Sequence, residues 1–282
     1  MSILIDGVSH SKLGRIPKDG EKSSQFILVK LLTGNSTISN TRTILNQRTD
    51  YSSLPPAETS SSISEFLTSY GIGGTTQKFI KNTISDNRNF YSHILNEFSN
   101  YFLQTKLGAH TSAFVFLYRI LEQLSFTAPL LYCSTQKDYM GTFEDLRKIF
   151  DPQLKGELGL FKKFLNEGKF IDALKLDILY AIKFNSSRNY QEKYFSTTKK
   201  HSKEFTSEDK TRFELEIKFR DVPSLIINIR NRFFHSATGN GRDNIKIREI
   251  LDPDEYFSCL NKTFCSVLAI IVLHTIASKY QT

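Results

Sequence analysis

A helical spacing of apolar residues runs through most of the chain from Ser64 onward. This spacing places one side of a helix against a core, so it predicts a mostly α fold. The stretch TTQKFIKNTISDNRNFYSHILNEFSNYFLQT is expected to form one amphipathic helix or two in series. Its apolar side chains recur three, four and seven residues apart, at Ile80, Ile84, Tyr91, Leu95, Phe98 and Phe102.

Four later segments also predict helices. AHTSAFVFLYRILEQLSF, after Gly108, is too apolar for a surface helix, and FIDALKLDILYAIKF has ordinary helical length. GTFEDLRKIFDP has Thr142 as an expected N-cap and should end before Pro152. TFCSVLAIIVLHTIA is about fifteen residues long, whereas a membrane span needs about twenty. We therefore expect a buried C-terminal helix, with His274 as a satisfied core histidine, and no membrane association.

Alternation of apolar and charged residues interrupts the helical pattern late in the chain. In RFELEIKFRD, apolar residues alternate with charges from Phe213 to Phe219, which predicts a half-buried strand. NIKIREI, residues 244–250, is a plausible partner, so a small antiparallel β ribbon is expected. The charged region at about residues 185–220 is interpreted as an insertion into the helical domain.

The first 63 residues differ from the rest. Short β-like stretches, SILID and SQFILVKLL, are separated by Gly-, Pro- and Ser-rich segments. The sequence therefore predicts an irregular or β N-terminal extension over residues 1–63, followed by one helical domain over residues 64–282.

Composition and charge narrow the range of functions. A formal net charge of +8 favours a polyanionic partner, because Lys and Arg that neutralise phosphates release condensed counterions. The three cysteines form no CxxC pair, so neither a disulfide framework nor a zinc site is indicated. The N-terminus does not resemble a secretory signal. We expect a cytoplasmic protein that needs no metal and no cofactor.

The stretch LIINIRNRFFHS, Leu225 to Ser236, places polar residues on a core helix. Asp221 fits an N-cap, Pro223 is tolerated in the first turn, and the helix should run to about Ser236. Its apolar stripe is Leu225, Ile226, Ile229 and Phe233.

Three polar residues, Arg230, Asn231 and His235, lie off that stripe. Asn231 and His235 are four residues apart, so the amide could orient the imidazole. Arg230 is about 140° round the helix from His235 and about 7.5 Å along it, so one helix frames a site without closing it. Two such helices meeting across a two-fold axis would close a cationic cleft. This arrangement suits attack of an RNA 2′-hydroxyl on phosphorus, with the imidazole moving the proton and the guanidinium stabilising charge.

RNRFFH, Arg230 to His235, resembles the Arg-Asn-x3-His signature of HEPN domains, and AFVFLYRILEQL resembles an early helix of these domains. The resemblance covers roughly residues 64–280. It implies a HEPN-like helical bundle that forms a homodimer and cuts RNA without metal, with Arg230 and His235 catalytic and Asn231 supporting. Glu122 and Arg119 are possible auxiliary residues. The family also implies a bacterial toxin or antiphage setting with a regulatory partner, which could be an antitoxin, an ATPase or a sensor.

Other interpretations stay open at this point. Weaker candidates for substrate binding are Arg232, Lys199, Lys200 and Lys203, although these lysines could equally belong to a solvated insertion. Glu122 and Arg119 could instead pair inside the bundle. The motif arginines could be solvated helix charges, with His235 favoured by the helix dipole. At the level of function, the alternatives are a non-catalytic HEPN-like scaffold and a nucleotide-binding module.

Overall fold

The computed structural model describes residues 4–5, 8–9, 23–34, 36–39, 44–47, 51, 63–74, 76–149, 156–166, 171, 173–234 and 244–280 of the 282-residue chain. Contacts divide the chain into two compact units. Unit 1 consists of Met1–Leu107 and Leu268–Thr282, and unit 2 of Gly108–Val267. The predicted N-terminal extension, residues 1–63, falls within unit 1.

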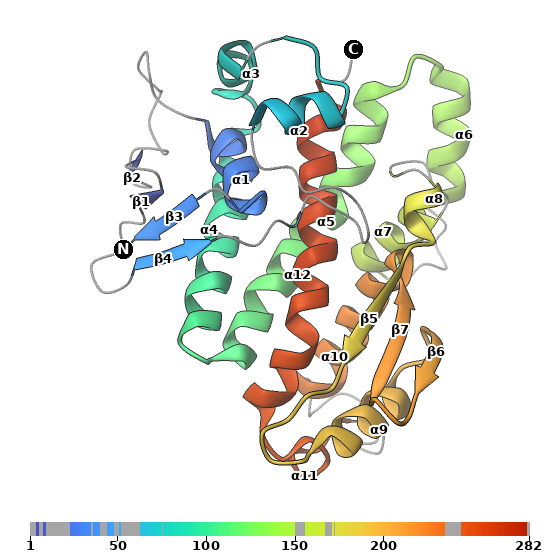
Figure 1. Ribbon diagram of the computed structural model, residues 1–282. Helices are drawn as coiled ribbons and strands as arrows, with labels where there is room; N and C mark the ends of the chain where they lie inside the picture. Colours follow the sequence, from blue (N-terminus) through green and yellow to red (C-terminus); the bar gives the residue numbers. More distant parts are fainter. Residues whose placement is uncertain are drawn as a thin grey trace. The chain divides into compact units, whose positions relative to one another are not determined.

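Unit 1 combines helices with a small antiparallel sheet (Figure 1). The helices are α1 (Ser24–Leu32), α2 (Ile63–Ser69), α3 (Thr76–Thr83), α4 (Arg88–Lys106) and the final turns of α12 (Pro253–Ser278). The strands are β1 (Leu4–Ile5), β2 (Val8–Ser9), β3 (Ser36–Ser39) and β4 (Ile44–Gln47), in the order β2-β1-β3-β4. The prediction of two helices in series is confirmed by α3 and α4.

The segment SQFILVKLL is helix α1, so its interpretation as a β-like stretch was wrong. Ser23 caps the helix, because its Oγ accepts the Phe26 N–H at 3.1 Å. Nearly every residue of α1 is buried. A helix buried on all sides carries no amphipathic period, so its apolar run looks like that of a buried strand.

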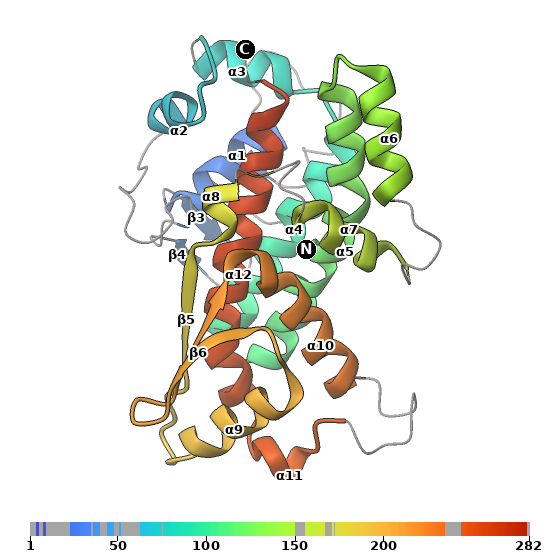
Figure 2. The same cartoon turned by 90° about the vertical axis from the view of Figure 1, so that its right-hand side faces the viewer.

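Unit 2 is a helical assembly with a three-stranded sheet, which Figures 1 and 2 show from two directions. Its helices are α5 (His110–Thr135), α6 (Tyr139–Ile149), α7 (Gly156–Asn166), α8 (Ala173–Leu176), α9 (Gln191–His201), α10 (Val222–Phe234), α11 (Ile247–Ile250) and the first turns of α12. Its strands are β5 (Leu179–Lys183), β6 (Phe205–Asp209) and β7 (Glu214–Lys218), and the 3-10 turn η2 (Phe219–Asp221) leads into α10. A mostly helical fold with a small antiparallel sheet is confirmed.

The predicted strand is β7, but its predicted partner was wrong. The sheet order is β5-β7-β6, with Tyr180 opposite Ile217. Residues 247–250 of NIKIREI form the helical turn α11 instead, because the Glu249 carboxylate accepts the Lys246 N–H at 2.8 Å and caps that turn. Phe213 adopts a left-handed φ of 51° in the turn before β7, so the strand starts one residue later than the alternation suggested.

Two further predictions in this region need correction. FIDALKLDILYAIKF holds only the short helix α8 before it becomes strand β5, in which buried Tyr180 and Ile182 alternate with exposed neighbours. The charged stretch after it forms α9 and β6, with Tyr194 and His201 buried. The buried side of α9 therefore packs into unit 2, so the interpretation of this segment as a solvated insertion was wrong for that side.

Helix boundaries near the site were predicted to within a few residues. α6 begins at Tyr139, four residues before the predicted start, because Asp138 rather than Thr142 caps it: the Asp138 Oδ1 accepts the Gly141 N–H at 3.1 Å. α10 begins directly after Asp221 and carries Pro223 in its first turn, as predicted. Its described part ends at Phe234.

The two longest helices are α5 and α12. By length and composition each could cross a membrane, and 50% and 78% of their most apolar windows are buried inside the structure. The C-terminal helix is buried as predicted. His274 is partly exposed rather than enclosed, with its ring 6.1 Å from that of Tyr70.

Candidate functional site

The motif helix α10 is fixed in unit 2 by apolar contacts along its length. Leu225, Ile226 and Ile229 are fully buried, as the stripe predicted. At its C-terminal end, Phe233 and Phe234 join an aromatic cluster with Phe114 of α5 and Phe257 of α12. The ring centroids of Phe114 and Phe234 are 5.9 Å apart and nearly parallel, and Phe233 lies 5.0 Å from Phe257. These contacts hold the motif in a defined position.

Arg230 is partly exposed and is held on two sides. Its guanidinium carbon lies 4.7 Å from the ring centroid of Tyr118 on α5, which is a cation–π contact. Its Nη1 donates to Asn231 Oδ1 at 3.1 Å, and Asn231 is itself exposed. The guanidinium is thus oriented while it stays open to solvent.

Tyr118 links this arginine to Glu122. The Glu122 carboxylate, one turn along α5, is close enough to the Tyr118 hydroxyl to affect its pKa. Burial raises the pKa of Tyr118, Arg230 opposes that rise, and Glu122 adds to it. The structure therefore brings Arg230 and Glu122 to Tyr118, a residue that was not predicted as part of the site, and Asn231 joins them through Arg230. The four-residue spacing of Tyr118 and Glu122 was the available signal.

The structure places the other predicted site residues as follows. Arg119 is exposed on α5 beside Tyr118. Arg232 is partly exposed on α10, and its carbonyl accepts the Ile245 N–H at 2.9 Å. His235 lies outside the described residues, so its expected place next to Asn231 stays a prediction.

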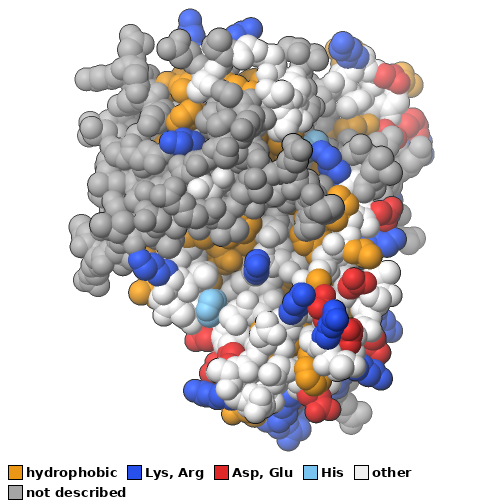
Figure 3. Space-filling model, in the orientation of Figure 1, with side chains coloured by type: hydrophobic (Ala, Val, Ile, Leu, Met, Phe, Trp, Pro, Cys, Tyr) orange, Lys and Arg blue, Asp and Glu red, His pale blue; other side chains and the backbone are white. Residues whose placement is uncertain are grey.

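The candidate substrate-binding lysines take part in ion pairs. Lys199 pairs with Glu208, and Lys200 Nζ lies 2.7 Å from Glu249 Oε1. Figure 3 likewise shows Lys and Arg interspersed with Asp and Glu over the sheet side of unit 2. Lys203 lines an open depression of about 460 Å³ with Lys218 and Arg220, which both pair with Asp177, and with the acidic Glu204 and Asp221. Lys203 therefore lies on a surface of mixed charge, and Lys199 and Lys200 have acidic partners.

A buried histidine lies between α9 and α11. The Nε2 of His201 is 3.7 Å from Glu249 Oε2, and burial lowers the pKa of His201 although Glu249 partly offsets the effect. Burial also disfavours ionised Glu249, but hydrogen bonds from Lys200 and the Lys246 N–H outweigh it and lower the pKa of Glu249 to about 2. At neutral pH this pair is a neutral imidazole beside a carboxylate.

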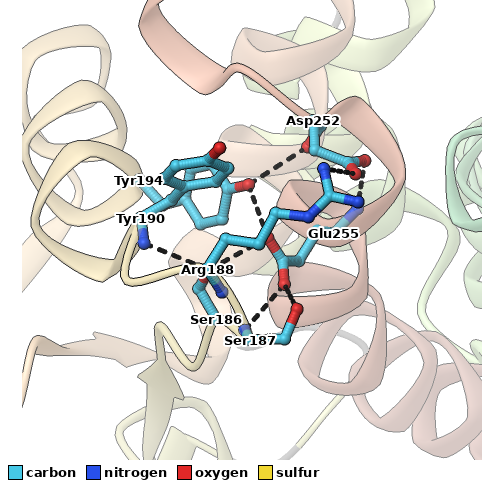
Figure 4. Close-up of polar contacts among 7 residues, drawn as sticks. All are labelled: Ser186, Ser187, Arg188, Tyr190, Tyr194, Asp252 and Glu255. Atoms are coloured by element: carbon cyan, nitrogen blue, oxygen red, sulfur yellow. Dashed lines mark hydrogen bonds and ion pairs between the residues drawn. The ribbon is translucent and has the colours of Figure 1, made fainter.

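A second carboxylate organises the loop between β5 and α9 (Figure 4). Glu255, in the first turn of α12, accepts hydrogen bonds from Ser186 Oγ at 2.9 Å, from the Ser187 N–H at 2.8 Å and from Tyr194 Oη at 3.0 Å. Its carboxylate also accepts a bond from Ser187 Oγ at 2.7 Å. Arg188 pairs with Asp252 at 3.6 Å beside it. We call these contacts the Glu255 clasp; they join the loop to α12.

Among the described residues, no cluster of three or more His, Cys, Asp or Glu side chains could hold a metal ion. The three cysteines, Cys133, Cys259 and Cys265, are free thiols. Comparisons with protein-family models, with curated proteins and with solved structures find no match for this chain.

Proposed function

We propose that the chain is a metal-independent endoribonuclease of the HEPN type, acting as a toxin or antiphage effector in the bacterial cytoplasm. The observation that carries the proposal is the state of Arg230. Its guanidinium is aligned by the Tyr118 ring and by Asn231, yet it remains accessible to a phosphate. A preoriented guanidinium can bind two phosphoryl oxygens with little further loss of side-chain conformational entropy.

In the proposed reaction, His235 accepts the proton of an RNA 2′-hydroxyl. The 2′-oxygen then forms a bond to the adjacent phosphorus, and the bond from phosphorus to the 5′-oxygen breaks. The 5′-oxygen leaves with a proton from the imidazolium of His235. Arg230 stabilises the charge on the phosphoryl oxygens, and the products are a 2′,3′-cyclic phosphate and a 5′-hydroxyl.

Two further elements belong to the proposal. A homodimer would bring two copies of the motif to one cleft, since a single helix frames only one side of it. A regulatory partner such as an antitoxin, an ATPase or a sensor would control the activity, and residues 1–63 are the first candidate for its contact.

The test is cleavage of a labelled RNA in the presence of a metal chelator. His235→Ala should reduce the rate by about 10²–10⁴-fold, because a general acid–base group is lost. Arg230→Ala should reduce it by about 10²–10³-fold through lost charge stabilisation. Arg212→Ala is the matched control, because this exposed arginine contacts Asp209 at 3.8 Å on the β6–β7 turn, away from the motif. End-group analysis should find the cyclic phosphate.

A requirement for magnesium, or full activity in both motif variants, would contradict the mechanism. A second function, a non-catalytic scaffold, is favoured by one observation: Arg230 already has protein partners in Tyr118 and Asn231. It predicts no RNA cleavage by the unmodified chain and a lower free energy of unfolding for Arg230→Ala.

A further inference from the structure

Helix α5, which has Pro129 inside it, carries a row of exposed residues along one side. The spacing between consecutive members is three or four residues, which is the spacing of a coiled-coil seam. The row consists of Ser112, Val115, Arg119, Glu122, Phe126 and Leu130. Its apolar members are well exposed: Val115 by 38%, Phe126 by 49% and Leu130 by 66%. We call this row the α5 seam.

The order of residues along the α5 seam is complementary to itself when reversed. If two α5 helices lie antiparallel, with a two-fold axis between Ile120 and Leu121, Arg119 of each copy faces Glu122 of the other. Val115 then faces Phe126 of the other copy on both sides of these ion pairs. The two apolar layers are separated by about 17 Å along the helix, at about 1.5 Å per residue, so they flank the charged centre.

We propose that the α5 seam binds the α5 seam of a second copy of this chain in this antiparallel arrangement. A parallel arrangement would place Arg119 against Arg119 and Glu122 against Glu122, which repel. In the antiparallel arrangement, each Arg119 lies opposite a Glu122 of the other copy and both apolar layers lose water. The pairing is isologous, since each contact occurs twice.

The α5 seam also passes the candidate site. Tyr118 precedes Arg119 in sequence, and the Arg230 guanidinium rests on the Tyr118 ring in each copy. The α5 seam is therefore the surface through which the homodimer of the proposed function would form. That this dimer creates a shared cleft for RNA rests on the proposed function. The pairing itself depends on the residues of α5.

The experiment measures the oligomeric state by sedimentation velocity over a range of protein concentrations. The unmodified chain should dimerise. Arg119→Glu and Glu122→Arg should each weaken self-association by about tenfold or more, because each makes the seam centre a cluster of like charges. An equimolar mixture of the two variants should form a heterodimer, since the two acidic positions of one then face the two basic positions of the other. Lys193→Glu, on exposed α9 surface, is the control.

Circular dichroism of each variant tests whether the helices remain folded, and Phe126→Ser gives a second disruption that leaves the charges in place. A monomeric unmodified chain, or two variants that still dimerise separately, would overturn the proposal. So would a mixture that associates no better than its components. RNA cleavage by a monomer would overturn the pairing and the shared cleft, and would leave only the proposed chemistry of His235 and Arg230 standing. If the unmodified chain dimerises and the two charge variants associate with each other, but no RNA is cleaved, the pairing stands and the proposed function is overturned.

Discussion

The carboxylate of Glu255 in unit 2 holds the loop between β5 and α9 through hydrogen bonds. Burial disfavours the ionised form of Glu255, but hydrogen bonds from Ser187, Ser186 and Tyr194 outweigh that cost and lower the pKa of Glu255 to about 2. Hydrogen bonds to a charged acceptor are among the stronger ones in proteins. The Glu255 clasp therefore fixes the entry to α9, and α9 contributes the buried Tyr194 and His201.

Replacing Glu255 by Gln is expected to lower the free energy of unfolding at pH 7 by about 1–2 kcal/mol, because the charged acceptor is lost. The folded pKa lies below the ordinary value of 4.5, so the contribution of the carboxylate is complete above pH 4.5. It is lost as the pH falls toward 2. Urea unfolding of both proteins between pH 7 and pH 3 checks this.

The difference between the two proteins should therefore shrink below pH 4.5. Glu192→Gln, at an exposed position of α9, is the control and should change little. A constant difference across the pH range would show that the carboxylate charge is not what the Glu255 clasp uses.

At the candidate site, the sequence could predict the polar motif but not its surroundings. Arg230 and Asn231 stand out because they are polar residues beside the apolar stripe of a core helix. The spacing of Tyr118 and Glu122 was a signal within α5, but the contact of Tyr118 with Arg230 could not be foreseen. It depends on which side of α5 faces α10, and periodicity within either helix does not contain that information. The expected orienting role of Asn231 toward His235 stays a prediction, and its observed partner is Arg230.

Among the elements, long amphipathic helices were predictable and short segments were not. α3, α4 and α10 repeat their apolar spacing over enough turns to identify a helix. β5 was missed because the run LDILYAIKF allows either period over so few residues. α11 was missed because a single turn has no period at all, and a local cap at Glu249 decides its conformation. The pairing of β7 with β5 and β6 is a long-range choice that the strand itself does not specify.

The aromatic cluster at the end of α10 depends on Phe257. This fully buried ring contacts Phe114, Phe233 and Phe234. Phe257→Ala should lower the free energy of unfolding by about 3–5 kcal/mol, because it leaves a cavity between α5, α10 and α12. Urea titration followed by circular dichroism measures the loss. Phe143→Ala, an exposed ring on α6, should stay within about 0.5 kcal/mol of the unmodified chain; equal losses would refute the packing role.

The two units share one helix. α12 begins in unit 2, where Glu255 and Phe257 anchor it, and its residues after Val267 belong to unit 1. This division was not visible in the sequence, because the apolar run of α12 continues through the boundary without a glycine, a proline or a change of period.

Ala269→Pro should break α12 at this junction, because proline removes an N–H and clashes with the carbonyl of Cys265 four residues earlier. The expected cost is about 3 kcal/mol or more and should fall mainly on unit 1. Native-state hydrogen exchange would show this as lost protection at Ile94 and Leu95 of α4, with less change at Leu215 and Ile217 of β7. Ala269→Gly keeps the N–H and should cost about 1 kcal/mol. Equal losses in both units would mean that they unfold as one.

The split composition of unit 1 affects the order in which the chain can fold during synthesis. Residues 1–107 leave the ribosome first, but their unit also contains residues 268–282, which leave it more than 160 residues later. Unit 2 is contiguous and can complete its core as it emerges. Unit 1 can therefore complete its core only after the last turns of α12 have been translated.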